Sequence, residues 1–261
     1  MGRWKIIFYM PAYDAATTLP EFLERFREVE KELVSIDADI EALIIVNDGS
    51  TDKTSEIITK SMNTLPYLKC LDKKKNGGAT DAVLDGMKEA LRLSQDQKNT
   101  ILVRLDSDLE HQPEDIVMML TPIVSNGAKL TVGYIPFDYR SGFFVKLFND
   151  YVGLNESRKF LGVDVPQFCP GFNAINAGLF RKIFPLLFEK AKRFRKNYGI
   201  DMLTLDFVML VLAKQLGQKP IVVKLSPIED KWLKKIPISK LFSYIDYHIK
   251  NVTFLGGEQE L

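Results

Sequence analysis

The chain has 261 residues, of which 46% are hydrophobic, enough to bury the core of one large α/β domain. Its 35 Lys and Arg residues balance 34 Asp and Glu residues, and the formal net charge is +1. This balance argues against nucleic acid as a partner, because nucleic-acid-binding domains carry a strong basic field. No apolar run approaches the roughly 20 residues of a membrane-spanning helix. The composition therefore predicts a cytoplasmic protein whose membrane contacts, if it makes any, are peripheral.

The first half alternates short apolar runs with stretches of helical periodicity. Strands are expected at 5–10, 41–46, 67–71, 100–105 and 129–134, and helices at 19–35, 53–62 and 80–93. Strands that alternate with helices of this length predict βαβ units and a mostly parallel sheet. In such sheets ligands bind at the carboxyl ends of the strands, so the loops after the strands are the segments to examine.

The helix expected at 19–35 shows why this pattern is informative. Thr18 precedes it and Glu21 follows three residues later, which is the spacing of a capping box. The spacing of three and four residues predicts one buried face, formed by Phe22, Phe26, Val29 and Leu33.

The second half is less regular. It predicts a helix or helix pair at 143–161, a loop and strand at 167–177, helices at 179–196 and 203–216, and a strand at 219–225. With no internal repeat or linker, we expect one domain over 1–230 and a tail over 231–261. Within the domain, 1–135 is expected to bind the first substrate and 136–230 the second.

Asp106 and Asp108 follow the apolar strand expected at 100–105. Two carboxylates at this spacing repel each other unless a cation lies between them. Such a pair suits a hard divalent ion, Mg²⁺ or Mn²⁺, which takes its other oxygen ligands from phosphate. The alternative interpretation is a solvated acidic turn before the next helix.

Three other loops follow strands and carry candidate ligand contacts. Asp48 can accept hydrogen bonds from the N–H groups of a base, although the segment around it also has the composition of a helix-capping turn. Asn76-Gly77-Gly78 allows the backbone to approach a ligand closely, or forms an ordinary turn. Pro11-Ala12-Tyr13 could wall a base or ribose pocket, or simply end its strand.

Together these segments resemble glycosyltransferase family 2. The resemblance rests on four motifs in order, namely PAYD at 11–14, VNDGSTDKT at 46–54, NGGATDAVLDG at 76–86 and LDSDLEHQPED at 105–115. It implies the GT-A fold, an α/β architecture with a Rossmann-like, mostly parallel sheet flanked by helices, and a nucleotide-sugar donor linked to UDP or GDP. The implied nucleotide contacts are Pro11, Ala12, Tyr13, Asp14, Asp48, Gly78 and Asp106. The implied ligands of Mg²⁺ or Mn²⁺ are Asp106, Asp108 and Glu110.

Within this family, the segment at 105–115 looks most like the branch that glycosylates polyprenyl phosphates, as dolichol-phosphate mannose synthases do. GFNAINAGLFRKI at 171–183 and KIPISKL at 235–241 add to that resemblance. Gly133-Tyr134-Ile135 stands where the branch usually has Gly-Ser-Arg. The expected cations for an acceptor phosphate are Arg140, Lys146, Lys235 and Lys240.

The acceptor stays open between three interpretations. For a polyprenyl phosphate, an inverting transferase needs no general base, and the segments 143–151 and 186–196 are candidates for peripheral membrane contact, or else core-facing helices. For a soluble or saccharide hydroxyl, a carboxylate base is required, and Asp206 is the first candidate before Asp201. A third interpretation is a non-catalytic nucleotide-binding protein. Nucleotidyl transfer is also compatible with paired carboxylates, but the glycine-rich basic N-terminal loop of such enzymes is missing.

Overall fold

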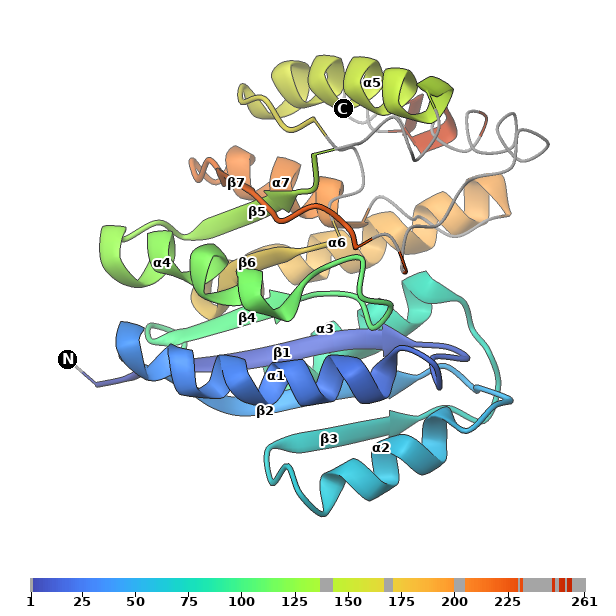
Figure 1. The fold of residues 1–261 in the computed structure, drawn as a ribbon. Coiled ribbons are helices and arrows are strands. Elements are labelled where there is room, and N and C mark those ends of the chain that lie inside the picture. Colours follow the sequence, from blue (N-terminus) through green and yellow to red (C-terminus); the bar gives the residue numbers. More distant parts are fainter. Residues whose placement is uncertain are drawn as a thin grey trace.

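The computed structural model describes residues 2–136, 143–166, 171–199, 205–229, 231, 246, 249–251 and 253–254, with the backbone alone for 143–150 and 152. Within these residues one seven-stranded sheet has the order β3-β2-β1-β4-β6-β5-β7 (Figure 1). The strands are β1 (Trp4–Ala12), β2 (Ala38–Asn47), β3 (Leu68–Asp72), β4 (Thr100–Arg104), β5 (Leu130–Tyr134), β6 (Asn173–Asn176) and β7 (Ile221–Lys224).

The sheet is mostly parallel, which confirms the predicted fold class. β1 pairs in parallel with β2 and β4, β2 with β3, and β5 with β7. β6 runs antiparallel between β4 and β5. All five strands expected in the first half are present, and each boundary lies within a few residues of its prediction.

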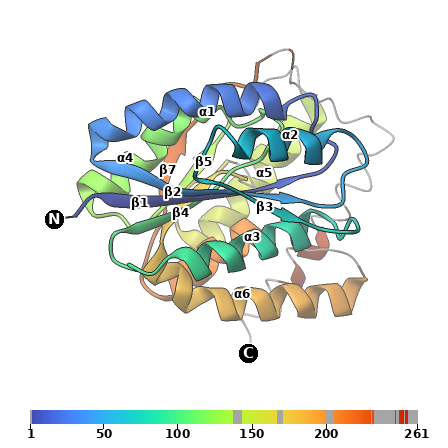
Figure 2. The same ribbon diagram turned by 90° about the horizontal axis from the view of Figure 1, so that it is seen from below.

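Helices cover both faces of the sheet (Figure 2). They are α1 (Leu19–Leu33), α2 (Thr54–Met62), α3 (Ala79–Leu93), α4 (Ile116–Asn126), α5 (Phe143–Leu161), α6 (Ala177–Tyr198) and α7 (Leu205–Gln215), with short 3₁₀ turns η1 (Val34–Ile36) and η2 (Pro113–Asp115). α1, α2 and α4 pack on one face, while α3, α6 and α7 pack on the other. Successive residues of β1 point to opposite faces of the sheet. Phe8 packs in the core on the side of α1, α2 and α4, and its neighbour Tyr9 packs in the core on the side of α3, α6 and α7.

The predicted buried face of α1 is confirmed, since Phe22, Phe26, Val29 and Leu33 are all buried. The predicted capping box is wrong. Thr18 has helical backbone angles (φ −100°, ψ −36°), whereas a capping residue is extended, and its side chain makes no cap hydrogen bond. Its hydroxyl instead donates to the carbonyl oxygen of Ser107 at 2.8 Å, which fastens the start of α1 to the loop after β4.

No helix in the part of the chain that the structure describes is long and apolar enough to cross a bilayer. α6 carries the basic segment 186–196, and its apolar side faces the core through Leu187, Ala191 and Phe194. The side chains of 143–150 are not described, so the proposed membrane role of that segment stays a prediction.

Candidate active site

The carboxyl ends of the neighbouring strands β2, β1 and β4 meet at one edge of the sheet. A pocket of about 320 Å³ opens there. It is lined by Pro11, Ala12, Tyr13, Asp48, Asn76, Ala79, Ala82, Asp106, Ser107 and Asp108. Residues from four separate motifs of the sequence therefore share one pocket, at the edge where the topology of a parallel sheet places ligands.

The loop after β4 is fixed by a hydrogen bond to the end of β1 and by a hydrogen bond within the loop itself. The hydroxyl of Ser107 donates to the carbonyl oxygen of Pro11 at 2.9 Å, and the backbone N–H of Glu110 donates to Asp108 Oδ1 at 3.1 Å. Leu109 has a left-handed backbone, with φ of +62°, and its side chain is fully buried. Strained backbone of this kind is held only where the surrounding structure determines it. These contacts direct Asp106 and Asp108 into the pocket.

Asp106 is supported by an arginine whose side chain is largely covered. The guanidinium of Arg104 donates to Asp106 Oδ1 at 2.9 Å, and the Arg104 side chain is only 12% exposed. The imidazole Nδ1 of His111 lies 3.7 Å from Asp106 Oδ2, and its ring packs on Phe172. Burial lowers the pKa of His111 below its usual value, so the ring is neutral at pH 7. Arg104 therefore supplies the positive charge next to this carboxylate.

Arg104 also contacts Asp206, at the start of α7, through a second guanidinium nitrogen. The other oxygen of Asp206 accepts a hydrogen bond from the amide of Asn173 at 2.6 Å. Burial raises the pKa of the Asp206 carboxyl, and the positive charge of Arg104 opposes that effect. Asp206 is 2% exposed and is not among the residues that line the pocket. Its predicted role as a general base is untested, and this position favours a supporting role.

Asp48 lines the pocket and is buried. Its carboxylate accepts the backbone N–H groups of Gly77 and Gly78 at 3.0 and 2.9 Å, and Lys73 Nζ lies 2.6 Å away. Gly78 has φ of +89°, a conformation that favours glycine. In this arrangement Asp48 holds the glycine segment against the pocket, and its predicted contact with a base remains a prediction.

Of two other predicted nucleotide contacts, Tyr13 lies in the pocket wall and Asp14 does not. Tyr13 lines the pocket and is 49% exposed, so its ring is accessible to a planar ligand. Asp14 is not among the lining residues. Its carboxylate accepts the N–H groups of Thr51 and Asp52 at 2.8 and 3.4 Å, and it has φ of +48°. Asp14 therefore joins the loop after β1 to the loop after β2.

The carboxylates in the pocket suit a divalent cation that is shared with a phosphate ligand. Among the described residues, no three His, Cys, Asp or Glu side chains come together as a complete metal site. Mg²⁺ is commonly held by one or two carboxylates with substrate phosphates as further ligands. Asp106 and Asp108 share the pocket and fit that mode. Glu110 does not line the pocket, so this arrangement gives no support to the expected third ligand.

Comparison with known proteins identifies the family. The model of glycosyl transferase family 2 matches residues 7–184, more than half of the chain. The chain belongs to glycosyltransferase family 2. The predicted family is therefore confirmed, and the protein is a glycosyltransferase on the GT-A fold.

The relatives that this chain resembles include an uncharacterised protein and a dolichol-phosphate mannosyltransferase. An uncharacterised protein of Methanocaldococcus jannaschii is 28% identical over 71% of this chain and 78% of its own length. The dolichol-phosphate mannosyltransferase of Pyrococcus furiosus is 27% identical over 49% of this chain. This chain spans only 32% of the length of that enzyme.

Solved structures support the fold across nearly the whole chain. Glucosyl-3-phosphoglycerate synthase from Mycobacterium tuberculosis, solved with phosphoglyceric acid, matches with a TM-score of 0.61 and 18% identity. The match covers 97% of this chain and 80% of that one. The same enzyme was also solved with Mn²⁺, UDP and glucosyl-3-phosphoglycerate.

The sequence alone assigned no role to Arg104. Gly171, Phe172 and Asn173 entered only as part of the segment at 171–183 that carried the family resemblance, with no role assigned to each. Arg104 offered one signal, since it is a charged residue at the end of a mostly apolar strand and needs a partner where it is covered. Of the predicted acceptor-phosphate residues, Arg140, Lys235 and Lys240 lie outside the described residues, and so does Asp201. The side chain of Lys146 is not described.

Gly171 packs directly against Asp106 and provides a test of the geometry of this carboxylate. A Cβ atom at this position would lie 2.5 Å from Asp106 Oδ2 and 2.8 Å from His111 Cε1. Gly171→Ala should therefore displace Asp106 and lower kcat/KM for sugar transfer by about a hundredfold, since small misplacements of reacting groups cost that much. Gly2→Ala is the control, because no atom lies within 4 Å of its added Cβ and its φ is not positive. Equal rates for the two variants would contradict this geometry.

Proposed function

We propose that this glycosyltransferase moves a sugar from a UDP- or GDP-linked donor to a polyprenyl phosphate, with inversion at the anomeric carbon. One observation carries the proposal. Asp48 follows β2, and Asp106 and Asp108 follow β4, but all three line the same pocket, together with the accessible ring of Tyr13. This arrangement can accommodate a base at one end and a diphosphate at the other.

Different residues of the pocket would bind different parts of the donor. Tyr13 and Asp48 would bind the base, and Pro11 and Ala12 would form the wall beside the nucleoside. Asp106 and Asp108 would hold Mg²⁺ or Mn²⁺ against the diphosphate. A divalent cation in that position supplies Lewis-acid stabilisation of the diphosphate leaving group. Arg104 orients the Asp106 carboxylate for this role through its hydrogen bond of 2.9 Å.

A phosphate acceptor removes the need for a base. With a pKa of about 6, a phosphate monoester is largely anionic at neutral pH. One of its oxygens would attack the anomeric carbon while the bond from that carbon to the donor diphosphate breaks. The bonding electrons leave with the nucleoside diphosphate. The position of Asp206 supports this interpretation, since both of its oxygens are engaged behind the pocket.

The names of the relatives point in the same direction. They include a dolichol-phosphate mannosyltransferase and an undecaprenyl-phosphate transferase of Proteus mirabilis, each 27% identical over less than half of this chain. A soluble hydroxyl acceptor is the second candidate. The likeness of nearly the whole chain to glucosyl-3-phosphoglycerate synthase favours including it in any test. Asp206 would then have to leave Arg104 to act as a base.

A product-partition assay separates these possibilities. The purified protein is incubated with radiolabelled UDP- and GDP-sugars, Mn²⁺ or Mg²⁺, and either a short polyprenyl phosphate or 3-phosphoglycerate. We expect label to enter the organic phase with the lipid acceptor. The assay also compares the variant Asp108→Asn with its matched control Glu56→Gln. Glu56 is an exposed carboxylate on α2, outside the pocket.

Label found only in a water-soluble glycoside would establish the hydroxyl acceptor and refute the lipid proposal. Donor binding without transfer to either acceptor, for all common donors, would favour the non-catalytic interpretation. Loss of transfer in Asp206→Asn with donor affinity intact would restore the base assignment.

A further inference from the structure

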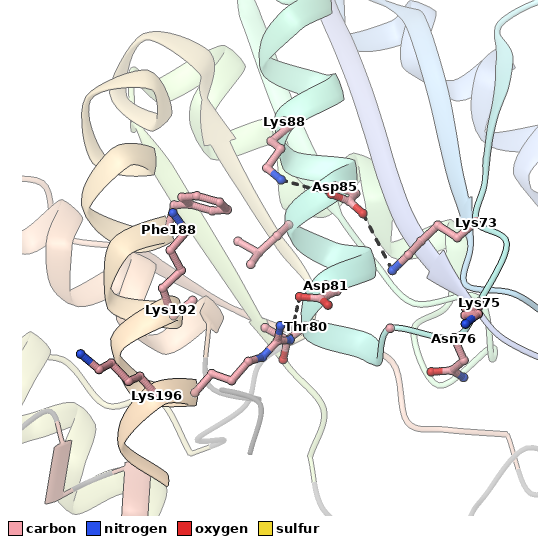
Figure 3. Close-up of a pocket in the computed structure, with 14 residues that line it drawn as sticks. Lys73, Lys75, Asn76, Thr80, Asp81, Asp85, Lys88, Phe188, Lys192 and Lys196 are labelled. Atoms are coloured by element: carbon pink, nitrogen blue, oxygen red, sulfur yellow. Dashed lines mark hydrogen bonds and ion pairs between the residues drawn. The ribbon is translucent and has the colours of Figure 1, made fainter. Parts of the chain in front are cut away.

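A second and larger cavity lies beside the donor pocket, between α3 and α6 (Figure 3). We call this cavity the α3–α6 groove. Its volume is about 640 Å³, which is within the usual size range of small-molecule sites. Its lining residues are Lys73, Lys75, Asn76, Gly77, Thr80, Asp81, Leu84, Asp85, Lys88, Phe188, Ala191, Lys192, Arg195 and Lys196.

The groove is strongly basic in a nearly neutral protein. Six of its lining residues are Lys or Arg and two are Asp, whereas the whole chain has a net charge of +1. Both aspartates are already paired, Asp81 with Arg195 at 2.7 Å and Asp85 with Lys88 at 3.2 Å. Two further cations of the groove pair with carboxylates outside its lining, Lys73 with Asp48 at 2.6 Å and Lys192 with Glu189 at 3.2 Å. Lys75 and Lys196 then carry the surplus of positive charge in the groove. Like charges gathered in a cavity repel one another and raise the local affinity for anions.

An aromatic ring holds two of these cations on opposite walls. Lys88 Nζ from α3 lies 4.8 Å from the centroid of the Phe188 ring, and Lys192 Nζ from α6 lies 4.4 Å from it (Figure 3). Contacts with an aromatic face stabilise ammonium groups. They place positive charge at both sides of the groove, where a ligand carrying two or more negative charges could be bound.

The groove is distinct from the donor pocket but adjoins it. Asn76 lines both cavities, whereas Asp106 and Asp108 line only the donor pocket. Gly77, in the wall of the groove, donates its N–H to Asp48, and Lys73 reaches the same carboxylate at 2.6 Å. A ligand in the groove would therefore contact the segment that positions Asp48.

We propose that the α3–α6 groove is a second anion-binding site, for a ligand that carries phosphate and is larger than a single phosphate ion. Lysine clusters bind phosphate as point charges, and the N-terminal turn of α3, represented here by Thr80, adds a favourable dipole. The phosphate can belong to a soluble metabolite or to the headgroup of an anionic lipid. The site does not depend on the identity of the sugar donor or acceptor.

The test uses inorganic pyrophosphate as the probe, measured by titration calorimetry with EDTA present. Without a cation, Asp106 and Asp108 repel pyrophosphate from the donor pocket, so binding reports on the groove. The double variant Lys88→Gln/Lys192→Gln removes one charge from each wall. Its matched control is Arg92→Gln/Lys182→Gln, which removes one charge from each of the same two helices at positions outside the groove. We expect Kd to rise about tenfold in the groove variant alone, from two modest charge contacts.

A vesicle arm distinguishes the two sources of phosphate. Co-sedimentation is measured with vesicles of phosphatidylcholine alone and of phosphatidylcholine with one-third phosphatidylglycerol. Weaker binding of the groove variant to the anionic vesicles, with the control variant unchanged, supports the proposal and identifies a lipid headgroup. An effect on pyrophosphate alone supports it and identifies a soluble ligand. If the wild-type protein binds neither probe, or if both variants lose binding equally, the proposal is overturned.

Discussion

Replacing either Asp106 or Asp108 by Asn is expected to lower kcat for sugar transfer by about a hundredfold to a thousandfold, the usual cost of removing one group that stabilises a developing charge. Both carboxylates line the pocket that also contains Asp48. Each substitution keeps the shape of the side chain and removes its charge. The assay is initial-rate transfer over a titration of Mn²⁺, and thermal unfolding shows that each variant is folded.

Glu110→Gln is the control variant within the same loop. Glu110 is not among the residues that line the pocket, so its variant should retain most of the activity. A loss as large as that of Asp108→Asn would mean that Glu110 is a metal ligand after all. Unchanged rates in both aspartate variants would exclude the proposed role of the acidic pair.

The second large effect is expected on stability, at the ion pair between the partly buried Arg104 and the buried Asp206. Their side chains are 12% and 3% exposed. Arg104→Met alone should lower the free energy of unfolding by about 3–5 kcal/mol, because it leaves the buried Asp206 carboxylate without its main partner. Asp206→Leu alone should cost less, because Arg104 keeps its hydrogen bond to Asp106. The double variant should lose much less than the sum of the two, since it removes both charges together. Urea unfolding of all four proteins measures the coupling.

Donor binding by the same four proteins tests whether Arg104 positions Asp106. Arg104 also donates to Asp106, so the folded double variant should bind the donor more weakly even where its stability recovers. If the double variant loses as much stability as the two single variants together, the two residues are not coupled. Full donor affinity in the double variant would show that Arg104 does not position Asp106.

Much of the donor half could be predicted because its determinants are local. The apolar runs and helical periodicity predicted the strands and helices, and the parallel topology then placed the loops after β1, β2 and β4 at one edge. For this reason Asp48 and Asp106 could be expected in a common pocket, although 58 positions separate them in the sequence. The chemistry of each loop followed from residue types that lie close together in the chain.

The remaining features depend on contacts between distant segments. The salt bridge from Arg104 to Asp206 joins residues 102 positions apart, and nothing near Asp206 in the sequence indicates its partner. The placement of β6 between β4 and β5 depends on how the second half folds back onto the sheet. Thr18 had the right spacing for a cap, but its hydroxyl bonds to Ser107, which the local sequence could not indicate. The α3–α6 groove likewise arises from two helices that are far apart in the chain.

The most direct test of the central claim is the affinity of UDP and GDP, measured by titration calorimetry with Mn²⁺ and then with EDTA. If Asp106 and Asp108 hold a cation against the donor diphosphate, one of these nucleotides should bind the wild-type protein much more tightly with Mn²⁺. The double variant Asp106→Asn/Asp108→Asn should lose that difference. Equal affinity in Mn²⁺ and EDTA for the wild-type protein, or a metal-dependent affinity that survives in the double variant, would contradict the account.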